Sequence, residues 1–302
     1  MQARLPRRDV TGILLLDKPL GLSSNAALQQ VKRAYLADKA GHTGSLDPLA
    51  TGVLPICLGE ATKLCGVLLD ADKSYRARAR LGLRTATGDA EGETVDTSDL
   101  REFEPRKLVD VLPRFLGAIE QVPPMYSALK HQGRRLYELA RAGQEIERQP
   151  RQVQILDLRL LACDTEFFEF EVRCSKGTYI RTLAEDWARA AGQCAHLVAL
   201  RRTAVAPFER AMLVSIPELE ALQYLADRDR LLLSPAAGLA HWPSVRVDTA
   251  EAAALAQGRV VTIAAAEALQ GRVAVLASDG ALLGLAEAGN QGQLAPKRWL
   301  RG

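Results

Sequence analysis

Residues 41–52 of the chain, GHTGSLDPLATG, combine three glycines and a proline with one carboxylate, that of Asp47. Glycine permits positive φ angles and close approach of the backbone, and Pro48 restricts Asp47 to extended or turn geometry. The stretch therefore predicts a rigid loop instead of a helix. Such loops often carry function, but Asp47 could also cap a structural turn, and the spacing alone leaves both interpretations open.

Apolar patterns on both sides of this loop predict alternating strands and helices. Residues 12–19 are a short apolar run closed by a charged pair and a proline, which is typical of a buried strand. Ser23 and Ser24 offer an N-cap to a helix over residues 25–36. After the loop, the patterns predict a strand over residues 53–58, a helix over 60–69 and a strand over 73–81.

The strand predicted over residues 73–81 has one apolar face and one basic face. Its apolar face begins with Tyr75, and its basic face carries Arg76, Arg78 and Arg80. A tyrosine at the start of an apolar face is usually a core residue whose hydroxyl finds a partner. The pattern alone therefore gives Tyr75 a structural role.

Strands and helices continue to mix beyond this strand. Residues 175–191 predict a turn that leads into a helix, with Arg181 in its first turn. A cation there opposes the helix dipole unless it faces a carboxylate, so Arg181 predicts an acidic partner elsewhere in the fold. The other elements expected here are a helix over residues 105–116 kinked at Pro113, a hairpin of strands over 153–161 and 166–174, a strand over 196–205 and a helix over 216–226.

The order of these elements shows no strict βαβ rhythm. We therefore predict an α+β fold for residues 1–240, with a mixed, largely antiparallel sheet and flanking helices. Prolines and a glycine loosen the chain over residues 234–244, which marks a boundary before a small β-rich domain over residues 241–302. The end of that domain places three cations beside Trp299, which suits RNA and equally suits a solvated final strand. Its expected strands cover residues 272–276, 282–287 and 297–300.

Composition places the chain among ordinary globular proteins. Its 302 residues are 48% hydrophobic and 25% charged, and the formal net charge of +3 does not by itself indicate a nucleic-acid binder. The charges are unevenly distributed. Residues 88–104 hold seven acids and one base, which we interpret as a solvated loop, whereas residues 124–151 hold six bases and three acids with aromatic residues between them. The second segment suits a polyanion as well as a mixed-charge helix face.

Metal-binding and nucleotide-binding patterns are absent from the sequence. The four histidines lie far apart, and the five cysteines are scattered and odd in number, which indicates reduced core residues. Phosphate-cradling and dinucleotide glycine motifs are also missing. No apolar run approaches the roughly 18 residues needed to cross a bilayer. We therefore expect a cytoplasmic protein with no metal, no other cofactor and no membrane partner.

Several motifs occur together in the order of one known family. Residues 41–52, LDKP at residues 16–19, Tyr75 and KGTYIR at residues 176–181 resemble the TruB-type bacterial tRNA pseudouridine-55 synthases. The likeness covers nearly the whole chain and is weakest in the tail. It implies a pseudouridine synthase-like fold with a C-terminal PUA-like, RNA-binding domain. It also implies an isomerase that converts uridine to pseudouridine at position 55, in the T loop of tRNA, without a cofactor and, as we expect, as a monomer.

The resemblance assigns roles to individual residues. Asp47 would be the catalytic carboxylate, either attacking the anomeric carbon or removing a sugar proton to open a glycal route. Arg181 would pair with Asp47 and keep it ionised. Tyr75 would stack on the target base, with its hydroxyl as a candidate for proton transfer at C5, while Tyr179 and Leu200 would line the base pocket.

Further residues would contact the RNA or support the loop. His42 would occupy the space that the target uridine leaves when it flips out. Residues 124–151 would close over the T arm, with their bases on phosphates. Lys18 and Pro19 would support the Asp47 loop. The cations predicted to contact RNA are Lys18, Lys130, Arg134, Arg135, Arg141 and Arg202.

Two functions from other classes remain compatible with the sequence. A protein that folds tRNA without chemistry would need the same basic segment and C-terminal domain. The substitution Asp47→Asn separates this function from catalysis, because binding survives and pseudouridine formation stops. A hydrolytic glycosylase would instead release free uracil, whereas an isomerase leaves the mass of the RNA unchanged.

Overall fold

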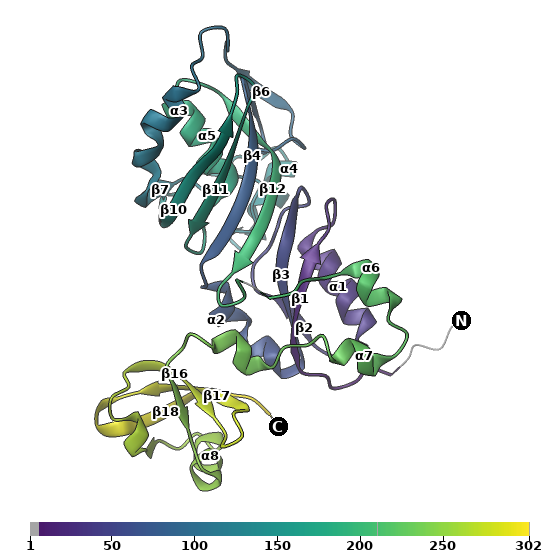
Figure 1. Ribbon diagram of the computed structural model, residues 1–302, viewed down its shortest axis with the longest axis vertical. Coiled ribbons are helices and arrows are strands. Elements are labelled where there is room, and N and C mark those ends of the chain that lie inside the picture. Colours follow the sequence, from purple (N-terminus) through teal and green to yellow (C-terminus); the bar gives the residue numbers. More distant parts are fainter. Residues whose placement is uncertain (1–5, 210, 302) are drawn as a thin grey trace.

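The computed structural model describes residues 6–209 and 211–301, and its main element is a nine-stranded sheet (Figure 1). The strand order is β13-β1-β3-β12-β4-β11-β10-β7, with β2 beside β3. Within the described residues, the β1–β13 and β3–β12 pairs are parallel and the other pairs are antiparallel, which confirms the predicted fold class. The strands are β1 (Gly12–Lys18), β2 (Ala40–His42), β3 (Ala50–Leu58), β4 (Lys73–Leu81), β7 (Gly117–Gln121), β10 (Arg151–Cys163), β11 (Phe167–Cys174), β12 (Ala195–Val205) and β13 (Val214–Ser215).

Helices cover both faces of this sheet in different places. The helices of this part of the chain are α1 (Ser24–Ala34), η1 (Gly59–Leu64), α2 (Cys65–Leu69), α3 (Arg106–Val111), η2 (Leu112–Phe115), α4 (Leu136–Arg141), α5 (Ile180–Ala190), α6 (Ile216–Ala221), α7 (Leu225–Asp229) and η3 (Pro235–Leu239), of which α4 lies in a segment that projects from the sheet. Strands β1 and β3 are apolar along their length because α1 packs on one face and η1 with α2 on the other. Helices α3 and α5 cover β4, β10 and β11 around Trp187, whose indole N–H donates to the Leu108 carbonyl at 2.8 Å.

Strand β4 shows how the sequence pattern sets the two faces of the sheet. Its bounds, Lys73–Leu81, are those predicted. Tyr75 lies in the core, whereas Arg76, Arg78 and Arg80 are exposed on the other face. Arg76 pairs with Glu169 of the neighbouring β11 at 2.5 Å. Alternation therefore aims Tyr75 toward the side of the sheet that α5 covers.

Two predicted helices are interrupted in the structure. The segment over residues 60–69 begins as the 3-10 helix η1, because the Thr62 hydroxyl donates to the Gly59 carbonyl at 2.7 Å and tightens the turn before α2. The segment over residues 216–226 divides into α6 and α7, because the backbone of Leu222 is extended between them. Both corrections concern continuity and leave the position of these segments unchanged.

The interpretation of residues 88–104 as a solvated loop was wrong in part. Residues Thr94–Thr97 form β6, an exposed strand paired with β5 (Leu83–Thr85). Asp89 is buried, because its side chain accepts hydrogen bonds from the Thr87 hydroxyl at 2.5 Å and the Glu91 N–H at 3.2 Å. The first acid of the run therefore belongs to the interior of the protein.

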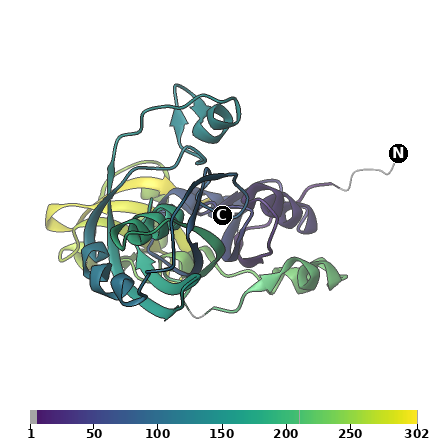
Figure 2. The same ribbon diagram turned by 90° about the horizontal axis from the view of Figure 1, so that it is seen from above.

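Residues 124–151, here called the basic segment, project from the sheet between β7 and β10 (Figure 2). The segment contains a short hairpin of β8 (Lys130–His131) and β9 (Arg134–Arg135), followed by α4. The guanidinium groups of Arg135 and Arg141 lie 5.8 and 5.6 Å from the centre of the Tyr137 ring. Among the described residues of this segment, the long apolar side chains that are fully buried are Leu136 and Leu139 of α4.

A second sheet forms the C-terminal part of the molecule (Figure 1). Its strand order is β14-β16-β17-β18-β15, and its own core includes Val273, Val275 and Leu294. Trp299 packs against this core, so its indole is partly buried. The sequence analysis predicted β16 and β17 but missed β14 and α8. The elements are β14 (Ser244–Arg246), α8 (Thr249–Ala256), β15 (Val261–Thr262), η4 (Ala264–Ala266), β16 (Gly271–Leu276), β17 (Leu282–Ala288), η5 (Asn290–Gly292) and β18 (Gln293–Trp299).

This second sheet packs directly on η1 and α2. Leu64 and Leu68 share one buried cluster with Leu282 and Leu285 of β17. Polar bonds join the same surfaces, since Lys63 Nζ donates to the Trp299 carbonyl at 2.7 Å. The division of the chain at residue 240 remains a prediction, because one core cluster crosses it.

Candidate active site

The Asp47 loop (residues 43–49) joins β2 to β3 and is anchored on α1. The Ser24 hydroxyl donates to the Leu46 carbonyl at 3.0 Å and accepts from the Leu46 N–H at 2.7 Å. The Ala50 N–H donates to the Asp47 carbonyl at 3.0 Å, which closes a turn around Pro48. These bonds make the loop the rigid connection that its composition predicts.

Lys18 holds the turn on which the Asp47 loop rests. Its ammonium donates to the carbonyls of Pro19 and Leu22 at 2.8 and 2.5 Å, and the Gly21 N–H in that turn donates to the Pro48 carbonyl at 2.8 Å. Lys18 is fully buried, and this burial lowers its pKa to about 8, against the opposing effect of Asp47. The prediction that Lys18 contacts RNA is therefore corrected: its side chain is turned inward to the loop.

Arg202 supports the other side of the Asp47 loop. Its Nε donates to the Val53 carbonyl at 2.7 Å and its Nη2 to the Gly44 carbonyl at 3.1 Å. Gly52 makes this close fit possible, because its φ is +100° and an added Cβ would lie 2.2 Å from the Arg202 carbonyl oxygen. Arg202 is buried, so the prediction of an RNA contact is corrected here as well. Charge alone gave no sign of burial for either cation.

Arg181 meets Asp47 directly, although 134 residues separate them in the sequence. Its Nε lies 3.1 Å from an Asp47 carboxylate oxygen. Its Nη1 donates to the Thr87 carbonyl at 2.6 Å and lies 3.5 Å from Asp89, and its Nη2 donates to the Tyr126 carbonyl at 2.8 Å. Almost the whole guanidinium is thus bonded, which fixes its plane and the position of Asp47. The acidic partner that the helix dipole predicts for Arg181 is present.

Asp89 is the site residue that the sequence analysis missed. The side chains of Asp89 and Arg181 are only 5% and 6% exposed, so their charges are held away from water. The Leu197 N–H donates to the Gly88 carbonyl at 3.0 Å and ties the Asp89 turn to β12. The one signal in the sequence was that Asp89 follows Thr87 and Gly88, a combination typical of a tight turn. A count of charges could not distinguish this acid from its exposed neighbours.

The surroundings of Asp47 alter the pKa of its carboxyl group. Its side chain is 42% exposed, so water reaches the carboxylate. Desolvation by the neighbouring residues raises the pKa of Asp47 and Asp89 raises it as well, whereas Arg181 and Lys18 lower it. The pKa lies above its ordinary value, and Arg181 opposes this shift by favouring the ionised form.

Tyr75 and Leu200 lie on neighbouring strands beside this pair. Tyr75 of β4 stands opposite Arg202 of β12, and Leu200 stands between Ala50 of β3 and Ala77 of β4. Both side chains are largely buried and belong to one cluster with Leu46 of the Asp47 loop. Burial raises the pKa of the Tyr75 phenol, and the adjacent Arg202 guanidinium acts against this effect. The phenol is therefore protonated at neutral pH.

His42 and Tyr179 approach the site from two other elements. His42 ends β2, and its Nδ1 accepts from the Gly44 N–H at 3.4 Å. Burial and the nearby Arg202 lower the pKa of His42, so its ring is neutral at pH 7. Tyr179 precedes α5, and burial raises the pKa of its phenol. Both residues thus present uncharged rings.

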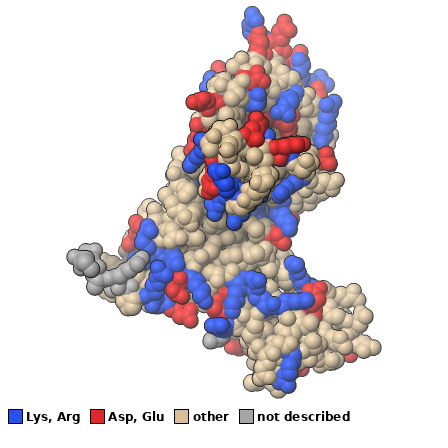
Figure 3. Space-filling view, turned by 180° about the vertical axis from the view of Figure 1, so that it is seen from behind, with Lys and Arg blue, Asp and Glu red and all other residues tan. Residues whose placement is uncertain are grey.

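The predicted RNA-binding cations of the basic segment lie on its surface, apart from the site. All four are exposed, and so are many other bases on the rear face in Figure 3, where Lys and Arg gather toward the junction with the C-terminal sheet. Exposed cations of this kind suit phosphate contacts, which need charge more than fixed geometry. The four are Lys130, Arg134, Arg135 and Arg141.

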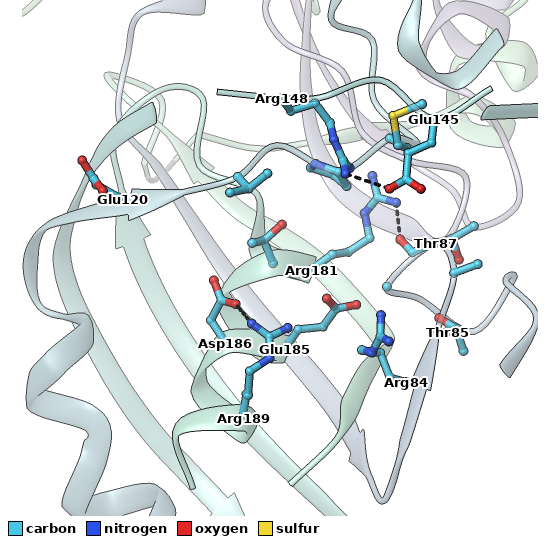
Figure 4. Close-up of a pocket in the computed structure, with 16 residues that line it drawn as sticks. Arg84, Thr85, Thr87, Glu120, Glu145, Arg148, Arg181, Glu185, Asp186 and Arg189 are labelled. Atoms are coloured by element: carbon cyan, nitrogen blue, oxygen red, sulfur yellow. Dashed lines mark hydrogen bonds and ion pairs between the residues drawn. The ribbon is translucent and has the colours of Figure 1, made fainter. Parts of the chain in front are cut away.

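A cavity of about 420 Å³ adjoins Arg181 on the side of α5 (Figure 4). It separates α5 from the base of the basic segment, and the Arg148–Glu145 pair lies across it from Glu185. Burial raises the pKa of Glu185 to about 7. Asp47 does not line this cavity, which therefore lies beside the Asp47–Arg181 pair and does not contain the carboxylate.

No group of three or more potential metal ligands occurs among residues 6–209 and 211–301. None of the helices in this part of the chain has the length and apolar character to span a bilayer. All five cysteines are free thiols.

Sequence comparisons identify related proteins. Residues 32–180 match the family described as TruB family pseudouridylate synthase (N-terminal domain), residues 181–236 match a tRNA pseudouridylate synthase B C-terminal domain, and residues 243–300 match the C-terminal family of pseudouridine synthase II TruB. A tRNA pseudouridine synthase B of Chromohalobacter salexigens is 51% identical, over 96% of this chain and 94% of the relative. One of Methylobacillus flagellatus is 50% identical, over 100% and 99%.

Solved structures share the fold at much lower sequence identity. A Cbf5–Nop10–Gar1 complex contains a chain with a TM-score of 0.72 and 24% identity, covering 96% of this chain and 84% of the other. An H/ACA ribonucleoprotein bound to a substrate RNA containing 2′-deoxyuridine contains one with a TM-score of 0.74 and 22% identity, covering 96% and 85%. These matches confirm the sheet with flanking helices and the PUA-like second sheet.

Proposed function

Because this chain belongs to the TruB family of pseudouridylate synthases, and is thus an isomerase that converts uridine to pseudouridine in tRNA, we propose that it acts on position 55 in the T loop with Asp47 as its catalytic carboxylate. The observation that carries this proposal is the 3.1 Å contact between Asp47 and the buried Arg181. A carboxylate so placed is accessible to solvent and oriented by a guanidinium that favours its ionised form. All the proposed catalytic side chains come from one chain, in keeping with a monomer.

The reaction breaks the bond between ribose and uracil N1, turns the base and joins it through C5. The breaking bond leaves an electron-poor sugar carbon, which a carboxylate stabilises by attacking it, as in retaining glycosidases. The same carboxylate serves a glycal route if it removes a sugar proton instead. In both routes Asp47 must enter the reaction ionised. Arg181 supports that ionised state, and its attraction to the Asp47 carboxylate strengthens once RNA excludes water from the site.

Tyr75 supplies the second group that the reaction needs. Its ring lies beside Leu200, so a uracil base stacked on the ring would also meet an apolar wall. A stacked base is free to turn while it remains held, which fits an isomerisation. The protonated Tyr75 phenol is a candidate to relay a proton: it would give its own proton to uracil N1, and the transient phenolate, stabilised by Arg202 beside it, would then take up the proton that leaves C5.

The target uridine must flip out of the RNA stack to reach Asp47 and Tyr75. Extrusion of a base costs a few kcal/mol, and protein groups must replace the contacts that are lost. The neutral ring of His42, at the end of β2 beside the Asp47 loop, is suited to fill the vacated space. The basic segment would hold the T arm through phosphate contacts, and the C-terminal PUA-like sheet would add further RNA contacts.

The decisive experiment is incubation of the protein with unmodified tRNA, followed by mapping of pseudouridine at nucleotide resolution. We expect pseudouridine at position 55 with the wild-type protein and none with Asp47→Asn, while both bind tRNA alike. The matched control is Asp110→Asn, which changes an exposed acid of α3 and should leave product formation unaltered. Product from Asp47→Asn at the wild-type rate would contradict the assigned role of the carboxylate.

Product analysis separates the isomerase from a glycosylase that shares the carboxylate. An isomerase leaves the mass of the tRNA unchanged and releases no base. Free uracil in the chromatogram would mean that water, and not C5, captures the sugar. Pseudouridine at a different nucleotide would support the proposed reaction but contradict the proposed position in the tRNA.

A further inference from the structure

Gln121 ends β7 and makes two hydrogen bonds to the backbone of Tyr179. Its Oε1 accepts from the Tyr179 N–H at 3.0 Å, and its Nε2 donates to the Tyr179 carbonyl at 3.2 Å. The side chain is buried, with 2% of the residue exposed. A carboxamide is the side chain that can donate and accept in this way toward a single residue.

The bonded residue is the one at which α5 begins. Tyr179 occupies the N-cap position, where serine, threonine, aspartate or asparagine usually satisfies the first turn of a helix. Its carbonyl accepts the first helical bond, from the Leu183 N–H at 3.0 Å, as well as the bond from Gln121. The start of α5 is thereby tied to the edge strand of the sheet.

The two hydrogen bonds between Gln121 and Tyr179 hold the backbone next to Arg181 in place. Arg181 lies two residues after Tyr179, in the first turn of α5. The far end of its guanidinium is held by the carbonyls of Thr87 and Tyr126. A rigid guanidinium orients Asp47 only if the backbone that carries it is equally fixed.

The basic segment is connected to the same arrangement. It begins three residues after Gln121, and its first residues provide the Tyr126 carbonyl to Arg181. The neighbouring Ser127 carbonyl accepts from the Tyr137 N–H at 3.1 Å, next to the exposed hairpin. Gln121 therefore lies where the RNA-contacting segment leaves the sheet and where the catalytic helix begins.

We propose that Gln121 is a positioning residue of the pseudouridine synthase site, which fixes the Tyr179 peptide and through it the approach of Arg181 to Asp47. The proposal rests on the assigned roles of Asp47 and Arg181. Gln121 contacts neither the RNA nor the reacting atoms in this assignment. Its effect is on the geometry of the catalytic pair.

The test uses Gln121→Met, which keeps the volume and removes both hydrogen bonds, with full-length protein and unmodified tRNA. The single-turnover rate at saturating protein should fall about 100-fold, the size of effect that a misplacement of about 1 Å produces. The Kd for tRNA should stay within about twofold, since no RNA contact changes. Gln152→Met, an exposed residue on the neighbouring β10, is the matched control and should retain the wild-type rate.

A pH profile distinguishes positioning from general loosening of the fold. Arg181 and Lys18 lower the pKa of Asp47, whereas Asp89 raises it. If Gln121→Met loosens Arg181, the Asp47 pKa rises, and the acid limb of the rate profile moves to higher pH. A residue needed only for folding would lower the melting temperature and leave this limb in place for the folded fraction.

The possible results each decide the proposal. A wild-type rate with an unmoved acid limb, or a loss confined to tRNA binding, would overturn it. Gln121→Asn, which keeps the amide but cannot reach Tyr179, repeats the measurement if Gln121→Met fails to fold. Failure of both to fold would assign Gln121 to stability alone. Failure of the proposed function is distinguishable, because the wild-type protein would then form no pseudouridine at position 55.

Discussion

The Asp47 loop and the basic segment carry charges for the same proposed substrate in opposite ways. The loop has one carboxylate, and bonds from α1, the turn after β1 and Arg202 fix its backbone. The basic segment has exposed cations on a short hairpin, with few inward apolar side chains. Bond making requires an atom in one place, whereas phosphate attraction tolerates movement. The backbone is therefore fixed at the loop for which chemistry is proposed, whereas the proposed phosphate contacts lie on an exposed hairpin.

The largest effect expected from this contrast is that of Arg181→Met. The variant leaves Asp47 without its partner and Asp89 with a buried charge, so the single-turnover rate should fall about 1,000-fold. The acid limb of the rate profile should move to higher pH, because Arg181 lowers the pKa of Asp47. The free energy of unfolding should fall by about 3 kcal/mol. The comparison is Arg189→Met, which breaks an exposed pair on the same helix and should keep the rate.

Gly52→Ala tests whether the loop owes its position to a close backbone contact. A methyl group there would lie 2.2 Å from the Arg202 carbonyl oxygen at a φ of +100°, so we expect a loss of about 3 kcal/mol in the free energy of unfolding. Gly143→Ala in the basic segment also has a positive φ but meets no atom within 4 Å, and should cost about 1 kcal/mol. Equal losses in denaturant titrations would remove the contrast between the two regions.

Asp89→Asn tests the buried acid behind Arg181. The amide keeps the shape but loses the charge that faces the guanidinium, so the rate at saturating tRNA should fall about 100-fold while the Kd is unchanged. The partner variant is Asp96→Asn, an exposed acid from the same run. If both variants keep the wild-type rate, neither acid of residues 88–104 contributes to the reaction, and the role assigned to Asp89 is wrong.

The smallest effect should come from the basic segment. Replacing Lys130, Arg134 and Arg135 by alanine should weaken tRNA binding about tenfold at moderate salt and leave the saturated rate unchanged. The plot of the logarithm of the association constant against the logarithm of the salt concentration has a negative slope, and its magnitude should decrease by about 2 for three lost phosphate contacts. A fall in the saturated rate without a change in slope would mean that these cations act on chemistry.

The local sequence pattern predicted most of the fold. The bounds of β4 and the positions of β1, α1, β10, β11 and α5 follow from periodicity and caps, which are local properties. The order of strands in the sheet does not, because pairs such as β3 with β12 join segments about 150 residues apart. Breaks such as that at Leu222 depend on tertiary packing, which propensity does not contain.

The candidate site was predictable where local geometry makes a demand. Arg181 in a first helical turn required an acid, and the glycine-rich stretch required a fixed loop around Asp47. The burial of Lys18, Arg202 and Asp89 was not predicted, because the charge of a side chain does not show whether it turns inward. Backbone carbonyls satisfy Lys18 and Arg202, and no residue pattern announces a carbonyl acceptor. Gln121 gave no signal for the same reason.

The shared cluster of Leu64, Leu68, Leu282 and Leu285 bears on how this protein can be dissected. A chain truncated after residue 240 would lose the cover from an apolar surface on η1 and α2, and such surfaces favour aggregation. The C-terminal sheet can therefore not be removed or exchanged by itself without exposing part of the shared core. Chimeras that exchange the C-terminal sheet between related proteins should therefore transfer η1 and α2 with it, so that both sides of this apolar interface come from the same protein.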